Sequence, residues 1–187
     1  MDQRELVERA RQGEHDAFTS LIDVRLARLD AAARLILRDP ELARDAVQEA
    51  LIRAWRDLPG LRDPDRFEAW LHRLTVNACL DLVRRRKRRV IEVELTPIDQ
   101  PATHDVAGAL ADRQLLDQAL AGLAPSHRAV VALHYLLGMP LPEVAASLRI
   151  PIGTAKSRLH YALAAMRTTV TAEPETATAT VVGGNLA

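Results

Sequence analysis

Residues 40–58 read PELARDAVQEALIRAWRDL, and this stretch decides the class of fold. Its apolar side chains recur at steps of three and four residues: Leu42, Ala46, Val47, Ala50, Leu51, Ala54, Trp55 and Leu58. That spacing places them on one face of a helix. Asp39 and Pro40 form a helix start signal, and the sequence LPG at 58–60 ends the helix.

Helical patterns continue on both sides of this stretch. Residues 3–89 are helical in pattern throughout, and 66–89 is apolar nearly all round before it turns basic, which is typical of a helix packed between neighbours. A second helical block spans 109–169, with breaks at 122–125, 138–142 and 149–153. The strands of a Rossmann or barrel enzyme are absent from the pattern, so we expect an all-α fold.

Between the two blocks, Pro-containing and acidic residues replace the periodic pattern. We therefore predict two small helical domains, 1–91 and 110–170, joined by a flexible acidic linker at 92–109. The Thr- and Ala-rich segment 171–187 has no period and is expected to be a disordered tail.

Composition restricts the class of protein. The chain has 187 residues, of which 48% are apolar but only 3% aromatic, and the single cysteine, Cys79, excludes an internal disulfide. No stretch approaches the roughly 20 apolar residues of a membrane span, and the first residues lack a signal core. We expect a cytoplasmic protein that makes no membrane contact.

The zero net charge conceals an uneven distribution. Residues 1–91 carry 19 Lys and Arg against 16 Asp and Glu, and 120–170 carry five against one. Residues 92–119 carry one Arg against six acids. Two basic segments separated by an acidic one are compatible with binding to nucleic acid.

The second block contains a short helix at 142–148, a tight turn at 149–153 and a longer helix at 154–167, the pattern of a helix-turn-helix. One face of the longer helix is polar at its start, as a helix that reads the major groove requires. This face and its flanks comprise Thr154, Lys156, Ser157, Arg158, His160 and Tyr161. An ordinary helical hairpin with a solvated face has the same spacing.

Four segments resemble extracytoplasmic-function sigma factors of the sigma-70 family. GTAKSRLH at 153–160 resembles the recognition helix of the −35-binding domain, and LAPSHRAV at 123–130 resembles the stretch that leads into it. ARDAVQEALIRAW at 43–55 resembles the polymerase-binding helix. FEAWL at 67–71, with the downstream polar and basic residues, is similar to the −10-binding helix.

The resemblance implies a monomeric factor that carries core RNA polymerase to promoters and helps to open them. Its first domain would bind the β′ coiled coil and the opened −10 strand, and its second the β flap and the −35 duplex. An anti-sigma protein is a further candidate partner. No catalytic residues, metal ligands or cofactor site are expected, because nothing resembles a metal cluster, a nucleophile elbow or a phosphate loop.

On the helix expected at 40–58, the residues away from the apolar face form a polar, acidic stripe. We assign it to core polymerase binding: Asp45, Gln48, Glu49 and Ile52. The alternative is a solvated face, in which Asp45 or Glu49 pairs with Arg53 or Arg56.

The candidates for −10 binding lie before and along the helix expected at 66–89: Arg62, Asp63, Asn77, Asp81, Arg84, Arg85 and Arg88. The six cations at 84–89 are more than a helix C-terminus needs, which indicates contact with phosphates. Asn77 and Asp81 lie one turn apart, and by resemblance they read bases. An internal hydrogen bond of Asn77 and a pair between Asp81 and Arg85 are the alternatives.

Two residues depart from the family pattern. Pro140 stands where a Ser usually caps the first helix of the helix-turn-helix, and Tyr161 stands where an Arg is usual. The −35 sequence preference therefore stays open. A stand-alone helix-turn-helix regulator and a helical adaptor are the rival functions, and both would act without core polymerase.

Overall fold

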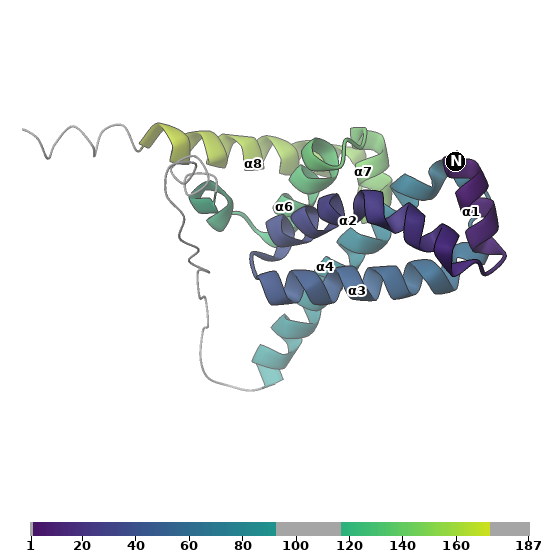
Figure 1. Ribbon diagram of the computed structural model, residues 1–187. Coiled ribbons are helices and arrows are strands. Elements are labelled where there is room, and N and C mark those ends of the chain that lie inside the picture. The colour runs from purple at the N-terminus through teal and green to yellow at the C-terminus, as the bar shows by residue number, and fades with distance from the viewer. Residues whose placement is uncertain (1, 93–116, 173–187) are drawn as a thin grey trace, which may run out of the picture.

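The computed structural model describes residues 2–92 and 117–172, and within these ranges every regular element is helical (Figure 1). In chain order the elements are α1 (Gln3–Arg11), α2 (His15–Leu37), α3 (Pro40–Asp57), two 3₁₀ turns (Leu58–Gly60 and Pro64–Arg66), α4 (Phe67–Glu92), α6 (Pro125–Val131), a π-helical turn (Ala132–Leu136), α7 (Leu141–Leu148) and α8 (Ile152–Ala172). The expected all-α class is confirmed. None of these helices combines the length and apolar content needed to cross a bilayer.

Helix α3 begins and ends where its signals predict. The Asp39 carboxylate accepts hydrogen bonds from the backbone N–H groups of Glu41, at 3.0 Å, and Leu42, at 3.1 Å. Pro40 occupies the first turn, where its missing N–H costs nothing. The helix gives way to the 3₁₀ turn at Leu58–Gly60.

Helices α2, α3 and α4 form the core of the first domain. In Figure 1, α2 and α3 lie side by side and α4 crosses behind them. Their buried faces meet at large apolar side chains, with Leu21, Leu29, Ile36, Phe67 and Leu71 each fully buried, as is Leu58 of the 3₁₀ turn after α3. Cys79 is also buried, and burial raises the pKa of its thiol to about 12, so the thiol stays protonated.

The helix-turn-helix is formed by α7 and α8. Arg149 takes a left-handed conformation, with a φ of 54°, and thereby turns the chain between the two helices. Ala145 and Ala155 are buried and small, which allows the helices to approach closely. As expected from Pro140, the N-terminus of α7 has no side-chain cap.

Helix α8 is longer at both ends than predicted. It begins at Ile152 rather than Thr154, because the Pro151 carbonyl already accepts a helical hydrogen bond from the Ala155 N–H, at 3.1 Å. It ends at Ala172, so the first two residues of the predicted tail are helical. The remaining tail and nearly all of the predicted linker lie outside the described residues.

The two domains pack against each other, which the sequence did not indicate. Leu35 of α2 contacts the apolar cluster of the second domain that contains Leu123 and Ala162. Arg128 of α6 is only 7% exposed, and its Nε donates to the Ile36 carbonyl at the end of α2, at 2.8 Å. The same guanidinium donates to the Leu123 carbonyl in its own domain, at 2.5 Å. One buried side chain therefore bonds backbone groups of both domains.

Candidate polymerase and nucleic-acid surfaces

The predicted polymerase-binding stripe lies on the outer face of α3. Asp45, Gln48 and Ile52 are exposed, and Ile52 is 55% exposed despite its apolar side chain. Glu49 is half-buried and accepts a hydrogen bond from Arg53 Nε at 2.8 Å. The ion pair expected for a solvated face is therefore present for Glu49. An exposed isoleucine is not explained by solvation.

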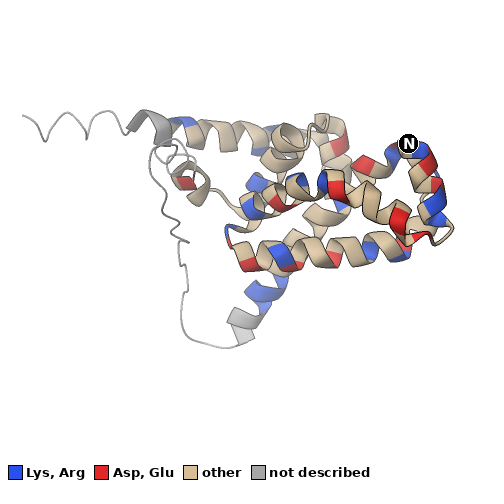
Figure 2. Ribbon diagram, viewed as in Figure 1, with Lys and Arg blue, Asp and Glu red and all other residues tan. Residues whose placement is uncertain are grey.

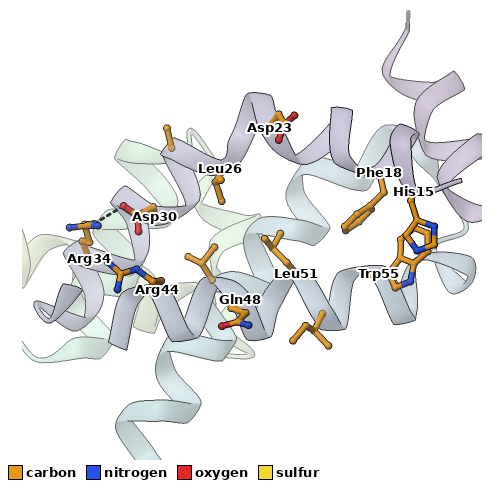
Figure 3. A pocket seen from close by; sticks show the side chains of 13 residues that line it. His15, Phe18, Asp23, Leu26, Asp30, Arg34, Arg44, Gln48, Leu51 and Trp55 are labelled. Carbon is orange, nitrogen blue, oxygen red and sulfur yellow. Dashed lines mark hydrogen bonds and ion pairs between the residues drawn. The ribbon is translucent and has the colours of Figure 1, made fainter. Parts of the chain in front are cut away.

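An apolar groove of about 970 Å³ runs beside this stripe, between α2 and α3 (Figure 3). Leu26, Leu51 and Ile52 contribute to its apolar lining. One end carries charged groups of both helices, including the Asp30–Arg34 ion pair at 2.5 Å. A long apolar trough with charges at one end has the form of a site for a partner helix.

The other end of the groove is aromatic. The rings of His15 and Phe18 of α2 lie 4.3 Å and 5.1 Å from Trp55 of α3, measured between ring centroids. Helical phase predicts that Trp55 belongs to the core, and no motif in the sequence singles out His15 or Phe18. A usable signal was present, because the segment 15–37 is apolar on more than one side.

The predicted −10 residues follow α4 from its start to its end. Arg62 and Asp63 lie exposed in the loop before it, where the Asp63 carboxylate also accepts a hydrogen bond from the Asp65 N–H at 3.1 Å. At a rise of 1.5 Å per residue, the 17 steps from Phe67 to Arg84 extend over about 25 Å. The set therefore forms an elongated strip, which suits an extended strand better than a single base.

The basic run at the end of α4 projects beyond the body of the domain (Figure 2). Arg84, Arg85 and Arg88 are exposed. Arg84 pairs with Asp81 at 2.9 Å and Arg86 with Asp39 at 3.6 Å. Two cations of the run are therefore partly held by carboxylates of the first domain.

Asp81 and Asn77 differ in their contacts. The Asp81 carboxylate binds Arg84 and, at 3.4 Å, Arg53 of α3, rather than Arg85 as the alternative interpretation expected. Asn77 is half-buried, and its side-chain amide makes no hydrogen bond to another described residue. Asn77 is therefore available to a ligand, whereas Asp81 is engaged within the protein.

A cleft of about 380 Å³ separates the −10 loop from the helix-turn-helix. Arg62, Asp63 and Trp70 line it from the first domain, and Glu143 and Ser147 of α7 line it from the second. The loop that is expected to hold a −10 base thus faces the other domain. The sequence could not indicate this contact, because the two segments lie about 80 residues apart.

The predicted −35 residues share the outer face of α8 near its N-terminus. Lys156, Ser157 and His160 are exposed, while Thr154 and Arg158 are half-buried. The Ser157 hydroxyl donates to the Thr154 carbonyl at 3.0 Å. No ion pair between Arg158 and Glu143 is found in the part of the chain that the structure describes.

Tyr161 is 57% exposed, and its ring lies 4.9 Å from the ring of His127 in α6. Burial, and then the nearby Arg158 charge, lower the pKa of His127 below its ordinary value. His127 is therefore neutral at pH 7, and it supports the Tyr161 ring without adding positive charge to this face.

These features define a two-domain helical protein with an apolar groove between α2 and α3, a basic strip at the end of α4 and a polar face at the start of α8. The comparisons with known proteins agree. Residues 21–89 match the family model "Sigma-70 region 2", and residues 113–166 match "Sigma-70, region 4".

Curated relatives match over most of their length. The chain is 37% identical over 154 residues to the ECF RNA polymerase sigma factor SigL of Mycobacterium tuberculosis, covering 81% of this chain and 87% of the relative. It is 35% identical over 155 residues to the RNA polymerase sigma-E factor of Streptomyces coelicolor, covering 83% and 86%. Among solved structures, the sigma factor RpoE in complex with the anti-sigma factor NepR from Bartonella quintana matches with a TM-score of 0.73 and 25% identity, covering 83% and 98%.

The chain therefore belongs to the extracytoplasmic-function family of RNA polymerase sigma factors. This family consists of transcription initiation factors, which act by binding core RNA polymerase and promoter DNA rather than by catalysis.

Proposed function

We propose that this sigma factor binds core polymerase through the outer face of α3 and the adjoining groove. Asp45, Gln48, Glu49 and Ile52 provide the exposed edge, and the groove residues of α2 provide the apolar floor. We assign the β′ coiled coil to this site, because an apolar trough beside polar groups suits a helical partner. The exposed Ile52 beside the groove is the observation that carries the assignment.

In this proposal the nucleic-acid contacts are divided between the domains. Arg84, Arg85 and Arg88 bind phosphates of the opened −10 strand, Asn77 reads a base, and Arg62 and Asp63 hold a base that has left the stack. Asp81 acts through its ion pairs with Arg53 and Arg84. Residues 1–91 are the polymerase and −10 domain, and 110–170 are the −35 domain.

On the −35 duplex, Lys156 and Arg158 bind phosphate while Thr154, Ser157 and His160 face base edges. Tyr161 supplies a hydroxyl where the family pattern has a cation. The second domain also contacts the β flap. An anti-sigma protein is proposed as a further partner, because the matched RpoE structure contains one.

The scarcity of aromatics supports a further part of the proposal. All six aromatic residues lie within the described part of the chain, and those of the first domain are buried, half-buried or in ring contacts. Stacking on exposed rings, worth about 1–3 kcal/mol per base, is therefore scarce at the −10 surface. Promoter opening then depends on pocket contacts and on a good −35 element.

Reconstitution tests the proposal. Purified protein is added to core polymerase with genomic promoter fragments, and start sites are mapped. Start-site-specific transcripts that depend on the protein, and that are lost when either promoter element is scrambled, are expected. Efficient opening with one element scrambled would contradict the dependence on both elements. Tight palindromic DNA binding without polymerase would instead favour a stand-alone regulator.

A further inference from the structure

Four charged side chains connect the proposed polymerase surface to the proposed −10 surface. Glu49 on α3 accepts a hydrogen bond from Arg53 Nε at 2.8 Å. Nη1 of the same guanidinium donates to the Asp81 carboxylate on α4, at 3.4 Å. The Asp81 carboxylate in turn accepts a hydrogen bond from Arg84 Nη1 at 2.9 Å. The chain of ion pairs alternates in sign and joins two successive α-helices, with Arg53 and Asp81 28 residues apart.

We propose that this chain of ion pairs couples polymerase binding to −10 strand binding, with Arg53 and Asp81 as positioning residues. The inference rests on the proposed assignment of Glu49 to the polymerase surface and of Arg84 to DNA. Neither Arg53 nor Asp81 needs to touch the partner or the strand.

The geometry makes Arg53 the central member. Its side chain is 22% exposed, whereas that of Arg84 is 67% exposed. Hydrogen bonding to Glu49 and then to Asp81 raises the pKa of Arg53, although burial opposes this, so the side chain stays charged. A planar guanidinium can serve two carboxylates at once, and losing one of them strengthens its interaction with the other.

The direction of the coupling follows from the signs of the charges. A polymerase cation that pairs with Glu49 removes a carboxylate from Arg53, and Arg53 then pairs more fully with Asp81. The Asp81 carboxylate is neutralised by Arg53 and holds Arg84 less strongly. Arg84 becomes free to bind a phosphate. By reciprocity, strand binding to Arg84 strengthens polymerase binding by the same factor.

The size of the effect is bounded by the exposure of the outer members. Glu49 and Arg84 are solvated enough that each pair is worth what a surface ion pair is worth. This corresponds to roughly two- to fivefold in affinity. Such a factor is measurable and favours DNA binding by assembled polymerase over binding by the free protein.

The test uses the free full-length protein and a fluorescent single-stranded DNA 15-mer of mixed sequence, titrated by anisotropy at several NaCl concentrations. Glu49→Gln imitates the polymerase-bound state of Arg53 and is expected to tighten binding two- to fivefold. Asp81→Asn releases Arg84 outright and should increase the slope of log affinity against log salt by about 0.7, the value of one additional phosphate contact on a single strand.

Matched variants separate the ion-pair chain from a general loss of negative charge. Asp57→Asn removes a carboxylate of similar side-chain exposure from the same helix, 45% against 46%, and its ion-pair partner is Arg56. It should tighten binding less than Glu49→Gln does. In an Arg53→Met background the effect of Glu49→Gln should disappear, and circular dichroism checks that each variant remains helical.

Equal effects of Glu49→Gln and Asp57→Asn, or an undiminished effect in the Arg53→Met background, would overturn the inference. Weaker binding by Asp81→Asn would also overturn it, because Asp81 would then contact the strand itself. None of these measurements uses polymerase. Failure here is thus distinguishable from failure of promoter-specific transcription, which would contradict the proposed function.

Discussion

Helices α3 and α8 both bury one apolar face and present the other to solvent, but their outer faces differ in kind. The outer face of α3 carries an exposed isoleucine beside an apolar groove, and its Glu49 and Arg53 are held in ion pairs. The outer face of α8 near its start carries hydroxyls, Lys156 and an exposed tyrosine. The difference supports the proposal that α3 binds a protein partner and α8 a polyanion, although both are amphipathic helices in all-α domains.

The largest expected effect tests whether the two domains, which contain α3 and α8, unfold together. In Arg128→Met, the Ile36 and Leu123 carbonyls lose a buried donor, and each unsatisfied group costs about 1–3 kcal/mol. We expect a loss of about 3 kcal/mol in the free energy of unfolding, or roughly 10 °C in Tm. Differential scanning calorimetry measures this shift and shows whether separate transitions for the two domains emerge.

Arg34→Met serves as the control for this variant. Arg34 lies near the same end of α2 and pairs with Asp30, but its side chain is 48% exposed. It should change stability by less than about 0.5 kcal/mol. A Tm of Arg128→Met within 2 °C or so of the wild type would mean that the domains pack together without depending on this residue.

The second prediction addresses the outer face of α3. Ile52→Asp places a charge at the edge of the apolar groove and should weaken core polymerase binding about 100-fold, as expected for a central interface residue. Binding of the free protein to duplex DNA through α8 should change far less. Titration of labelled protein with core polymerase measures the polymerase affinity, and fluorescence anisotropy measures the affinity for duplex DNA.

Val24→Asp is the matched control. Val24 is 75% exposed on α2 and is not part of the groove lining. If both substitutions weaken polymerase binding equally, the groove is not the contact and the comparison between α3 and α8 loses its basis.

The third prediction addresses the outer face of α8. Lys156→Ala removes an exposed cation at the start of the helix and should reduce duplex affinity about five- to tenfold. It should also lower the salt slope by about 0.9, one phosphate contact on duplex DNA. Arg56→Ala, which removes an exposed cation at the end of α3, should leave the duplex salt slope unchanged. Equal slopes for the two variants would mean that duplex DNA does not bind along α8.

The smallest expected effect is the loss of stability of the first domain in acid. His72 of α4 is 2% exposed, and burial lowers its pKa to about 4, although Glu68 nearby acts in the opposite direction. The unfolded chain binds this proton near pH 6.5 and the folded one does not, so stability declines as pH falls from 6.5 towards 4.

Urea unfolding at pH 7 and 5.5 provides the measurement. Over that interval the wild type should lose about 1 kcal/mol more than His72→Gln does. Equal losses would show that His72 takes up no proton on unfolding in this range.

How much of the structure the sequence predicts depends on how far apart in the chain the interacting residues lie. Asp39 and Pro40 predict the start of α3 because a helix cap bonds backbone groups only two or three residues further along the chain. Arg149 turns the chain where the break in pattern predicted a turn. The start of α8 was placed two residues late, because the Pro151 carbonyl can accept a helical hydrogen bond even though proline itself suggested a break.

The same distinction between local and long-range interactions applies to the site residues. The faces of α3 and α8 were predictable, since helical phase alone places Ile52 and Lys156 outward. The partners of Asp81 were not, because Arg53 approaches it from another helix, 28 residues earlier in the chain. The groove was also missed, since it requires two helices side by side.

The sequence by itself determined that the protein is all-α, that it ends in a helix-turn-helix and that it belongs among sigma factors, because periodicity, caps and motif spacing are local in the chain. Only the tertiary structure decided that Arg128 joins the two domains, that a groove adjoins the proposed polymerase face, and that Glu49, Arg53, Asp81 and Arg84 form one chain of charges. Those features depend on which helix faces meet in space, and many different pairings of faces are compatible with the same amphipathic pattern.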